Sequence, residues 1–173
     1  MQIKVEELSD IINFYPQQTI DVDGRILVAN KNIIPSAALC RNILELDAAM
    51  RILLTADLIS VKHTATDIET FKMLIMAEID DYFTIPYCVS GPADNLPIKD
   101  YAEALADAII RPTLKRDKGD IIIHNIDNGT MEMSFAGHCA GCPYAQNTLH
   151  NVVAKTFMRY LPQITEIKLR EKK

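Results

Sequence analysis

The chain has 173 residues and a mass of 19.4 kDa, enough for one or two small domains. Its composition, 49% hydrophobic and 24% charged, is that of a globular protein, and no apolar run approaches the roughly 20 residues of a membrane-spanning helix. Residues 1–83 hold 7 basic and 13 acidic side chains, a net charge of −6. Residues 99–173 hold 11 basic and 9 acidic side chains, and their net charge of +2 is too small to predict a nucleic-acid surface.

A proline-rich segment divides the sequence. Residues 84–98 contain three of the eight prolines and little periodic pattern, which predicts a linker between a domain at 1–83 and a second domain at 99–173. The first residues lack the features of a secretory or transit peptide. We therefore expect a location in the bacterial cytoplasm, or in the mitochondrial matrix after removal of a leader.

The first domain has the pattern of a small α+β unit of order β-β-α-β-β-α. The expected elements are strands at 11–15 and 25–29, a helix at 36–46, strands at 51–55 and 58–63, and a helix that ends near Phe83. Asp23-Gly24 is a hairpin-type turn signal between residues 19–22 and the second strand. Thr66 and Glu69 have the spacing of a capping box before the last helix.

The second domain has the order α-β-β-α-β. The expected elements are a helix from Lys99 that Pro112 ends or kinks, or that continues for one more turn through Leu114, strands at 121–126 and 131–135, a helix from Pro143, and a strand at 164–169. Asn128-Gly129 predicts a tight hairpin between the first two strands. In the second helix, an apolar stripe is expected at positions 149, 152, 153, 156, 157 and 160. Both domains together predict an α+β protein.

Two cysteines stand close together at the predicted junction between a strand and a helix. Cys139 and Cys142 form a C-x-x-C motif whose sulfurs can hold one metal or close a small disulfide. The N-terminus of the following helix favours the thiolate form. The other two cysteines stand apart: Cys40 is expected to be a small buried hydrophobe, and Cys88 lies in the expected linker with no predicted role.

Three kinds of chemistry compete for this motif. A dithiol–disulfide oxidoreductase uses the same local geometry, but only 31 residues follow Cys142, too few for the rest of a thioredoxin fold. A structural zinc site needs four ligands, and only His138 and His150 are near; we expect His138 to be a solvated loop residue. An iron–sulfur cluster also needs four thiolates, so a second chain would have to supply the other pair across a two-fold axis.

Several segments of the second domain resemble a known family. They are Ile110 to Leu114, Asp117 to Ile121, Phe135 to Pro143, Thr148-Leu149 and Leu161 to Ile164. In this order they resemble the C-terminal domain of NifU, the Nfu-type iron–sulfur scaffold. Residues 53–61 and the helix after them resemble, less closely, the extra N-terminal domain of Nfu proteins. The sequence departs from the family at Lys118-Gly119, where Gly-Gly is usual, and at His138, where a small residue is usual.

The resemblance implies a scaffold or carrier and not an enzyme. It implies a homodimer that binds a labile [4Fe–4S] cluster, or a [2Fe–2S] cluster, between the C-x-x-C motifs of two chains, with Cys139 and Cys142 as ligands. An upstream donor would load the cluster, and apo iron–sulfur proteins would receive it. No nucleic acid and no membrane is expected as a partner. The acidic first domain is expected to be a docking module for clients or donors.

Overall fold

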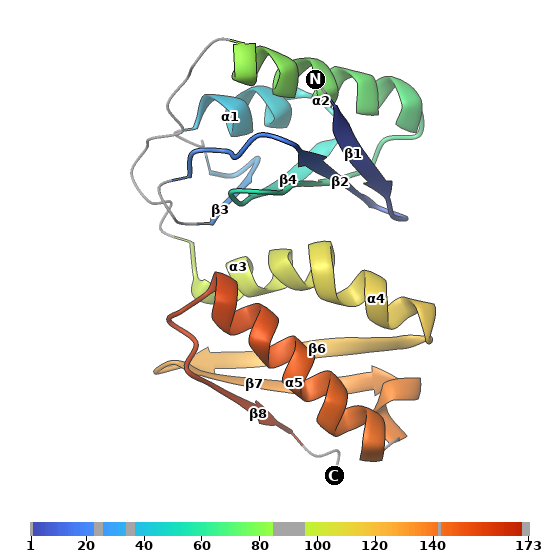
Figure 1. The fold of residues 1–173 in the computed structure, drawn as a ribbon, viewed down its shortest axis with the longest axis vertical. Helices are drawn as coiled ribbons and strands as arrows, with labels where there is room; N and C mark the ends of the chain where they lie inside the picture. The colour runs from blue at the N-terminus through green and yellow to red at the C-terminus, as the bar shows by residue number, and fades with distance from the viewer. Residues whose placement is uncertain (1, 23–25, 34–36, 85–95, 142, 171–173) are drawn as a thin grey trace. The chain divides into compact units, whose positions relative to one another are not determined.

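The computed structural model describes residues 2–22, 26–33, 37–84, 96–141 and 143–170, with the backbone alone at 141 and 143–149 (Figure 1). The chain forms two compact units, Met1–Leu96 and Pro97–Lys173. Most of the expected linker at 84–98 lies outside the described residues. No helix in the described part of the chain is long and apolar enough to cross a lipid bilayer.

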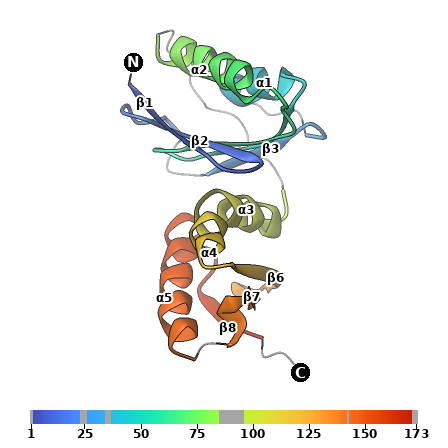
Figure 2. The same cartoon turned by 90° about the vertical axis from the view of Figure 1, so that its right-hand side faces the viewer.

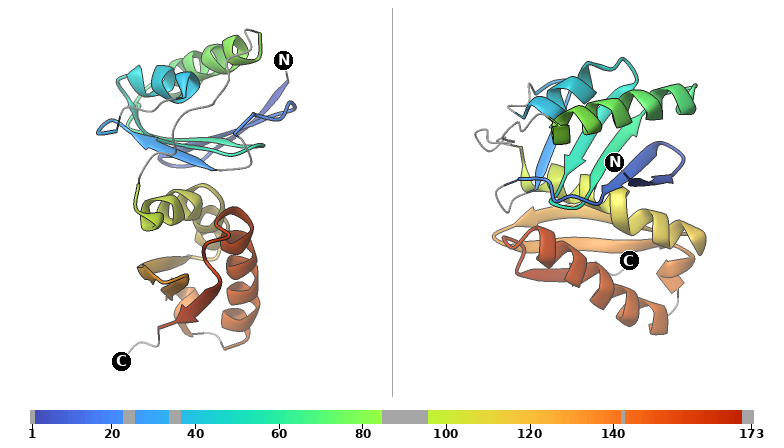
Figure 3. Two further views of the ribbon diagram at one scale, coloured as in Figure 1. Left: turned by 90° about the vertical axis from the view of Figure 1, so that its left-hand side faces the viewer. Right: turned by 45° about the horizontal axis from the view of Figure 1, so that its top comes forward.

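The first unit is an antiparallel five-stranded sheet with two helices on one face (Figure 3). Its elements are β1 (Ile3–Glu7), β2 (Ile11–Pro16), β3 (Leu27–Asn30), α1 (Ala38–Glu45), β4 (Ala49–Leu54), β5 (Ile59–His63) and α2 (Ile68–Thr84). The strand order is β1-β2-β5-β4-β3. The α+β class is confirmed, with one strand more than the sequence predicted.

The additional strand is β1, an edge strand that pairs with β2 alone. Its half-buried Ile3 and Val5 alternate with charged residues, a pattern short enough to be missed. The hairpin expected around Asp23-Gly24 is wrong in its pairing, because β3 pairs with β4 and residues 19–22 form no strand. The dipeptide itself lies outside the described residues.

The core of the first unit lies between the sheet and its helices. Phe14, Ile43, Ile75 and Ile79 are fully buried there. The N-terminus of α2 differs from the expected capping box, because Asp67 is the capping residue: its Oδ1 accepts a hydrogen bond from the Thr70 N–H at 3.1 Å. Hydrogen bonding from the Thr70 side chain, and next from the Thr70 backbone N–H, lowers the pKa of Asp67.

The second unit is a three-stranded sheet with its helices on one side (Figure 2). Its elements are α3 (Ile98–Leu105), a π-helical turn (Ala106–Ile110), α4 (Arg111–Arg116), β6 (Gly119–Asp127), β7 (Thr130–Gly137), a 3-10 turn (His138–Gly141), α5 (Pro143–Tyr160) and β8 (Glu166–Leu169). β6 and β7 are antiparallel, and α5 carries the chain to β8, which is parallel to β7.

The first helical run continues past Pro112, where the sequence predicted an end, a kink or one more turn through Leu114, as far as Arg116. The turn before the proline is π-helical, and the Arg111 N–H reaches back five residues to the Ala106 carbonyl. A proline has no N–H and crowds the preceding turn, so a wider turn at this point lets the helix continue.

The hairpin at Asn128-Gly129 is confirmed, with φ values of +47° and +79° that suit a tight turn of type I′. The apolar stripe of α5 is confirmed at Val153 and Phe157, which are buried, but is wrong at Val152, which is 58% exposed. Val152 is adjacent to the buried Val153, and neighbouring positions on a helix point about 100° apart.

Candidate functional site

Cys139 lies at the end of the β6–β7 hairpin that is distant from the tight turn. β7 ends at Gly137, and the 3-10 turn that follows carries His138 and Cys139. The Cys139 side chain is only 5% exposed, whereas His138 is exposed, as expected for a solvated loop residue. Cys142 lies outside the described residues, so the convergence of the two sulfurs stays a prediction.

The sulfur of Cys139 packs against the first residue of β6. A Cβ atom added to Gly119 would overlap the Cys139 Sγ, so the thiol occupies the space that any other side chain at 119 would fill. Gly119 is opposite Gly137 in the antiparallel ladder, and the His138 N–H donates to the Lys118 carbonyl at 3.1 Å. The cysteine turn is thereby fixed against the start of β6.

Exposed basic side chains surround the chain reversal that precedes β6. Lys115, Arg116 and Lys118 are exposed, with one acidic residue, Asp117, among them. Lys118 has a φ of +55°, a left-handed conformation that is unfavourable for a residue with a Cβ. Since Lys118 is bonded to Gly119, which packs against the Cys139 sulfur, these basic residues lie close to the cysteine turn along the chain.

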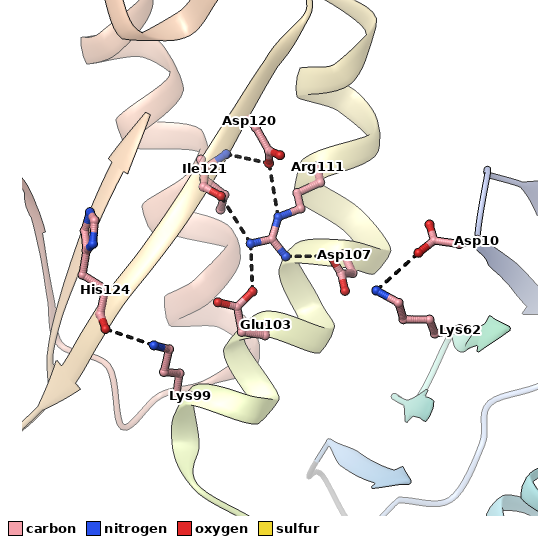
Figure 4. A network of polar contacts seen from close by, with 9 residues as sticks. All are labelled: Asp10, Lys62, Lys99, Glu103, Asp107, Arg111, Asp120, Ile121 and His124. Atoms are coloured by element: carbon pink, nitrogen blue, oxygen red, sulfur yellow. Dashed lines mark hydrogen bonds and ion pairs between the residues drawn. The ribbon is translucent and has the colours of Figure 1, made fainter. Parts of the chain in front are cut away.

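A half-buried arginine connects the first helical run to the same end of β6 (Figure 4). The Arg111 guanidinium contacts three carboxylates: Asp107 at 2.6 Å, Glu103 at 2.8 Å and Asp120 at 3.2 Å. It also donates to the Ile121 carbonyl at 3.2 Å. At the opposite end of β6, the Lys99 ammonium donates to the His124 carbonyl at 3.0 Å (Figure 4).

The charge on Arg111 is well compensated. Burial opposes that charge, but hydrogen bonds from its guanidinium to Asp107 and Glu103, and their negative charge, outweigh the burial and raise the pKa of Arg111. Its side chain is 16% exposed, so these contacts are little screened by water. Asp120 also accepts a hydrogen bond from the Ile121 N–H, which holds the residue after Gly119 in place.

The chemistry of the available donors suits iron. Thiolate sulfur is the usual ligand of iron–sulfur clusters, and the turn after β7 presents it from Cys139. Cys40 lies in α1 of the first unit and is buried as expected, whereas Cys88 lies outside the described residues. Within the described ranges, no group of three or more His, Cys, Asp or Glu side chains is arranged to hold a metal ion.

The spacing of the two cysteines predicted the site, but no sequence pattern predicted a role for Gly119 or Arg111. Both residues stand within the segments that resemble the NifU domain. The spacing of Asp107 and Arg111, four positions apart on a helix, was a signal that could have been used, but Gly119 is 20 positions from Cys139 and Arg111 is 9 positions from Asp120. A single sequence shows the residue types but does not show these contacts.

The chain is similar to known proteins over much of its length. Residues 103–168 match the NifU-like domain. The "NFU1 iron-sulfur cluster scaffold homolog, mitochondrial" of Drosophila willistoni is 30% identical over 123 residues, which cover 65% of this chain and 43% of the relative. The human protein of the same description is 26% identical over 145 residues, which cover 75% and 57%. The chain thus spans about half the length of these relatives.

One comparison with a solved structure covers a smaller part. The crystal structure of protein SAV1430 from Staphylococcus aureus matches 46% of this chain and 99% of its own, with 19% identity and a TM-score of 0.38.

Proposed function

We propose that this chain, which contains a NifU-like domain and is distantly related to iron–sulfur cluster scaffold proteins, binds a labile iron–sulfur cluster and passes it to apo-proteins. The observation that carries this proposal is the position of the cysteine turn inside the matched residues 103–168. The cluster is cargo, so the protein acts as a carrier and not as an enzyme.

The number of ligands supports a cluster shared by two chains. A [4Fe–4S] cluster is held by four thiolates, and the C-x-x-C motif supplies Cys139 and Cys142. Two motifs related by a two-fold axis complete the set, with one proton released from each thiol that binds iron. A [2Fe–2S] cluster would need the same four ligands. A cluster held between subunits is exposed to an incoming acceptor, which suits transfer.

The charge around the turn supports the binding of an anionic cargo. A cluster with four thiolate ligands carries net negative charge, and Lys115, Arg116 and Lys118 are exposed beside the turn.

The first unit, with its net charge of −6, is proposed to be the docking module for donors and clients. By analogy with the mitochondrial relatives, the site of action is proposed to be the mitochondrial matrix or a bacterial cytoplasm.

Anaerobic reconstitution with ferrous iron and sulfide tests the proposal. The expected product is a brown dimer with about four iron atoms per two chains, measured by absorption, iron analysis and native mass spectrometry. Cys139→Ser and Cys142→Ser should lose the cluster, whereas Cys88→Ser, the matched control, should keep it. Equal loading of all three variants, or a cluster bound by single chains, would refute the shared site.

Transfer is tested separately. The loaded protein should restore the [4Fe–4S] spectrum of an apo-ferredoxin faster than free iron and sulfide do at equal concentration. Glu45→Lys combined with Asp81→Lys, two exposed changes in the first unit, should slow transfer to a client that recognises its acidic surface while leaving the iron content unchanged. Catalytic reduction of a model disulfide by the cluster-free protein would instead favour a dithiol oxidoreductase.

A further inference from the structure

We infer that Gly119 is a positioning residue that holds the Cys139 sulfur in a buried seat in the cluster-free chain, from which the sulfur moves outward when iron binds. The outward movement rests on the proposed function, because only a ligand role requires it. The seat, which is the space beside Gly119 that the Cys139 sulfur fills, is argued from the packing of the described residues alone.

The seat exists because two glycines face each other at the end of the hairpin. A Cβ on Gly119 would overlap the Cys139 Sγ, and it would also lie 3.3 Å from the Cys139 Cβ and 3.4 Å from the Leu114 carbonyl oxygen. The sulfur therefore fills the position that a side chain at 119 would take. Any residue larger than glycine displaces the sulfur or shifts the backbone.

The second glycine brings the two backbones close enough for this packing. Gly137 has a φ of +63°, and a Cβ at this position would overlap the Lys118 carbonyl oxygen and lie 3.3 Å from the Gly119 Cα. The His138 N–H donates to the same carbonyl oxygen at 3.1 Å. Glycine is required at 137 for both its conformation and its lack of a side chain.

The other wall of the seat is anchored to the helical run. The N–H groups of Asp117 and Lys118 donate to the Leu114 and Lys115 carbonyls at 3.0 Å each, which closes the last turn of α4. On the other side of Gly119, Arg111 contacts Asp120 and the Ile121 carbonyl. Gly119 is thus fixed from both sides, so the seat is part of the fold and does not depend on a bound ligand.

The seat has a consequence for the proposed carrier. Cys139 is only 5% exposed, and a ligand shared by two chains must lie at the surface of each, so loading is inferred to move the Cys139 side chain away from Gly119. Before loading, the same burial shields the sulfur from alkylating and oxidising reagents, since these attack accessible thiolates. The cluster-free protein is thereby protected at one of its two proposed ligands.

Thiol labelling of the full-length, cluster-free chain tests the seat directly. With iodoacetamide and peptide mass spectrometry, we expect Cys139 to be labelled at least about tenfold more slowly in the folded chain than in urea. Gly119→Ala should raise the labelling rate of Cys139 about tenfold, because the added methyl displaces the sulfur. Ile122→Ala is the matched control: it changes a residue of the same strand that is 46% exposed, and it should leave that rate unchanged.

A double-mutant cycle separates displacement of the sulfur from general damage to the fold. Gly119→Ala should lower the urea midpoint in the wild-type background, and that loss should shrink by at least half in a Cys139→Ala background, because the overlapping sulfur is gone. If the stability losses of the two changes are additive, or if Cys139 is labelled rapidly in the wild type, the proposed packing of the Cys139 sulfur on Gly119 is wrong. Iron content measured on wild type and Cys139→Ser reports on the proposed function independently, so the two ideas can fail separately.

Discussion

The two units of this chain stabilise themselves in different ways. The first buries an apolar layer between a five-stranded sheet and two helices. The second has the only positive φ angles among the described residues, and they lie in pairs at the two ends of the β6–β7 hairpin: Asn128 and Gly129 at the tight turn, and Lys118 and Gly137 beside Cys139. Glycine and asparagine tolerate these angles, so Lys118 is the one position among the four where the backbone conformation costs stability, and it lies next to Gly119, on which Cys139 packs.

The largest expected effect is the loss of stability when a buried phenylalanine is truncated in the core of one unit or the other. Phe14→Ala in the first unit and Phe157→Ala in the second each remove a fully buried ring, so each should lower the free energy of unfolding by about 3–5 kcal/mol. Hydrogen exchange should show the loss of protection mainly in the unit that carries the change. Met73→Ala, at a site 64% exposed, is the control and should have little effect. Equal loss in both units would show that they unfold as one.

The next effect concerns Arg111, a half-buried charge of the second unit. Arg111→Met leaves Glu103, Asp107 and Asp120 without their shared cation, and we expect the free energy of unfolding to fall by about 3 kcal/mol. Urea unfolding followed by circular dichroism measures this change.

The matched control for Arg111 is an exposed ion pair of the first unit. Lys62→Met removes the contact with Asp10 at 3.3 Å (Figure 4), where both side chains are more than a third exposed, and it should change stability little. A similar loss in both variants would mean that burial does not distinguish the two sites.

A smaller effect of opposite sign is expected at Lys118. Lys118→Gly relieves a left-handed conformation and should stabilise the second unit by about 1 kcal/mol. Asn128→Gly is the comparison, and it should gain less because asparagine tolerates positive φ better than lysine does. Thermal unfolding measures both changes, and a loss of stability in Lys118→Gly would show that the lysine side chain makes a compensating contact.

The smallest effect is a dependence on pH in the first unit. Burial lowers the pKa of His63, with partial opposition from the charge of Asp10. The His63 Nδ1 accepts a hydrogen bond from the Ala65 N–H at 3.1 Å, which places the ring proton on Nε2, a buried atom with no hydrogen-bond partner among the residues that the structure describes. Folding therefore favours the neutral ring.

The unfolded chain binds this proton more readily, with a pKa near 6.5. The contribution of His63 to stability is therefore complete above pH 6.5 and is lost as the pH falls from 6.5 toward the lowered pKa of the folded state. His63→Gln should flatten the stability profile of the first unit over that range. Parallel profiles for the variant and the wild type would show that other groups cause the dependence.

Local signals predicted much of the fold. The Asn128-Gly129 hairpin and the start of α5 at Pro143 follow from the chemistry of turns and caps, which acts over a few residues. The pairing of β3 with β4 did not follow, because a turn signal at Asp23-Gly24 gives no information about a partner strand more than 20 residues away. Val152 was misassigned because apolar residues on a helix are not all buried.

The sequence by itself determined the α+β class, the C-x-x-C pair and the resemblance to a cluster scaffold, since these depend on residue types and short spacings. Only the tertiary structure decided that the Cys139 sulfur packs on Gly119 and that Arg111 contacts Asp120 and the Ile121 carbonyl of β6. The physical reason is that such contacts arise when strands and helices distant in sequence pack together, and their geometry is set by the whole unit.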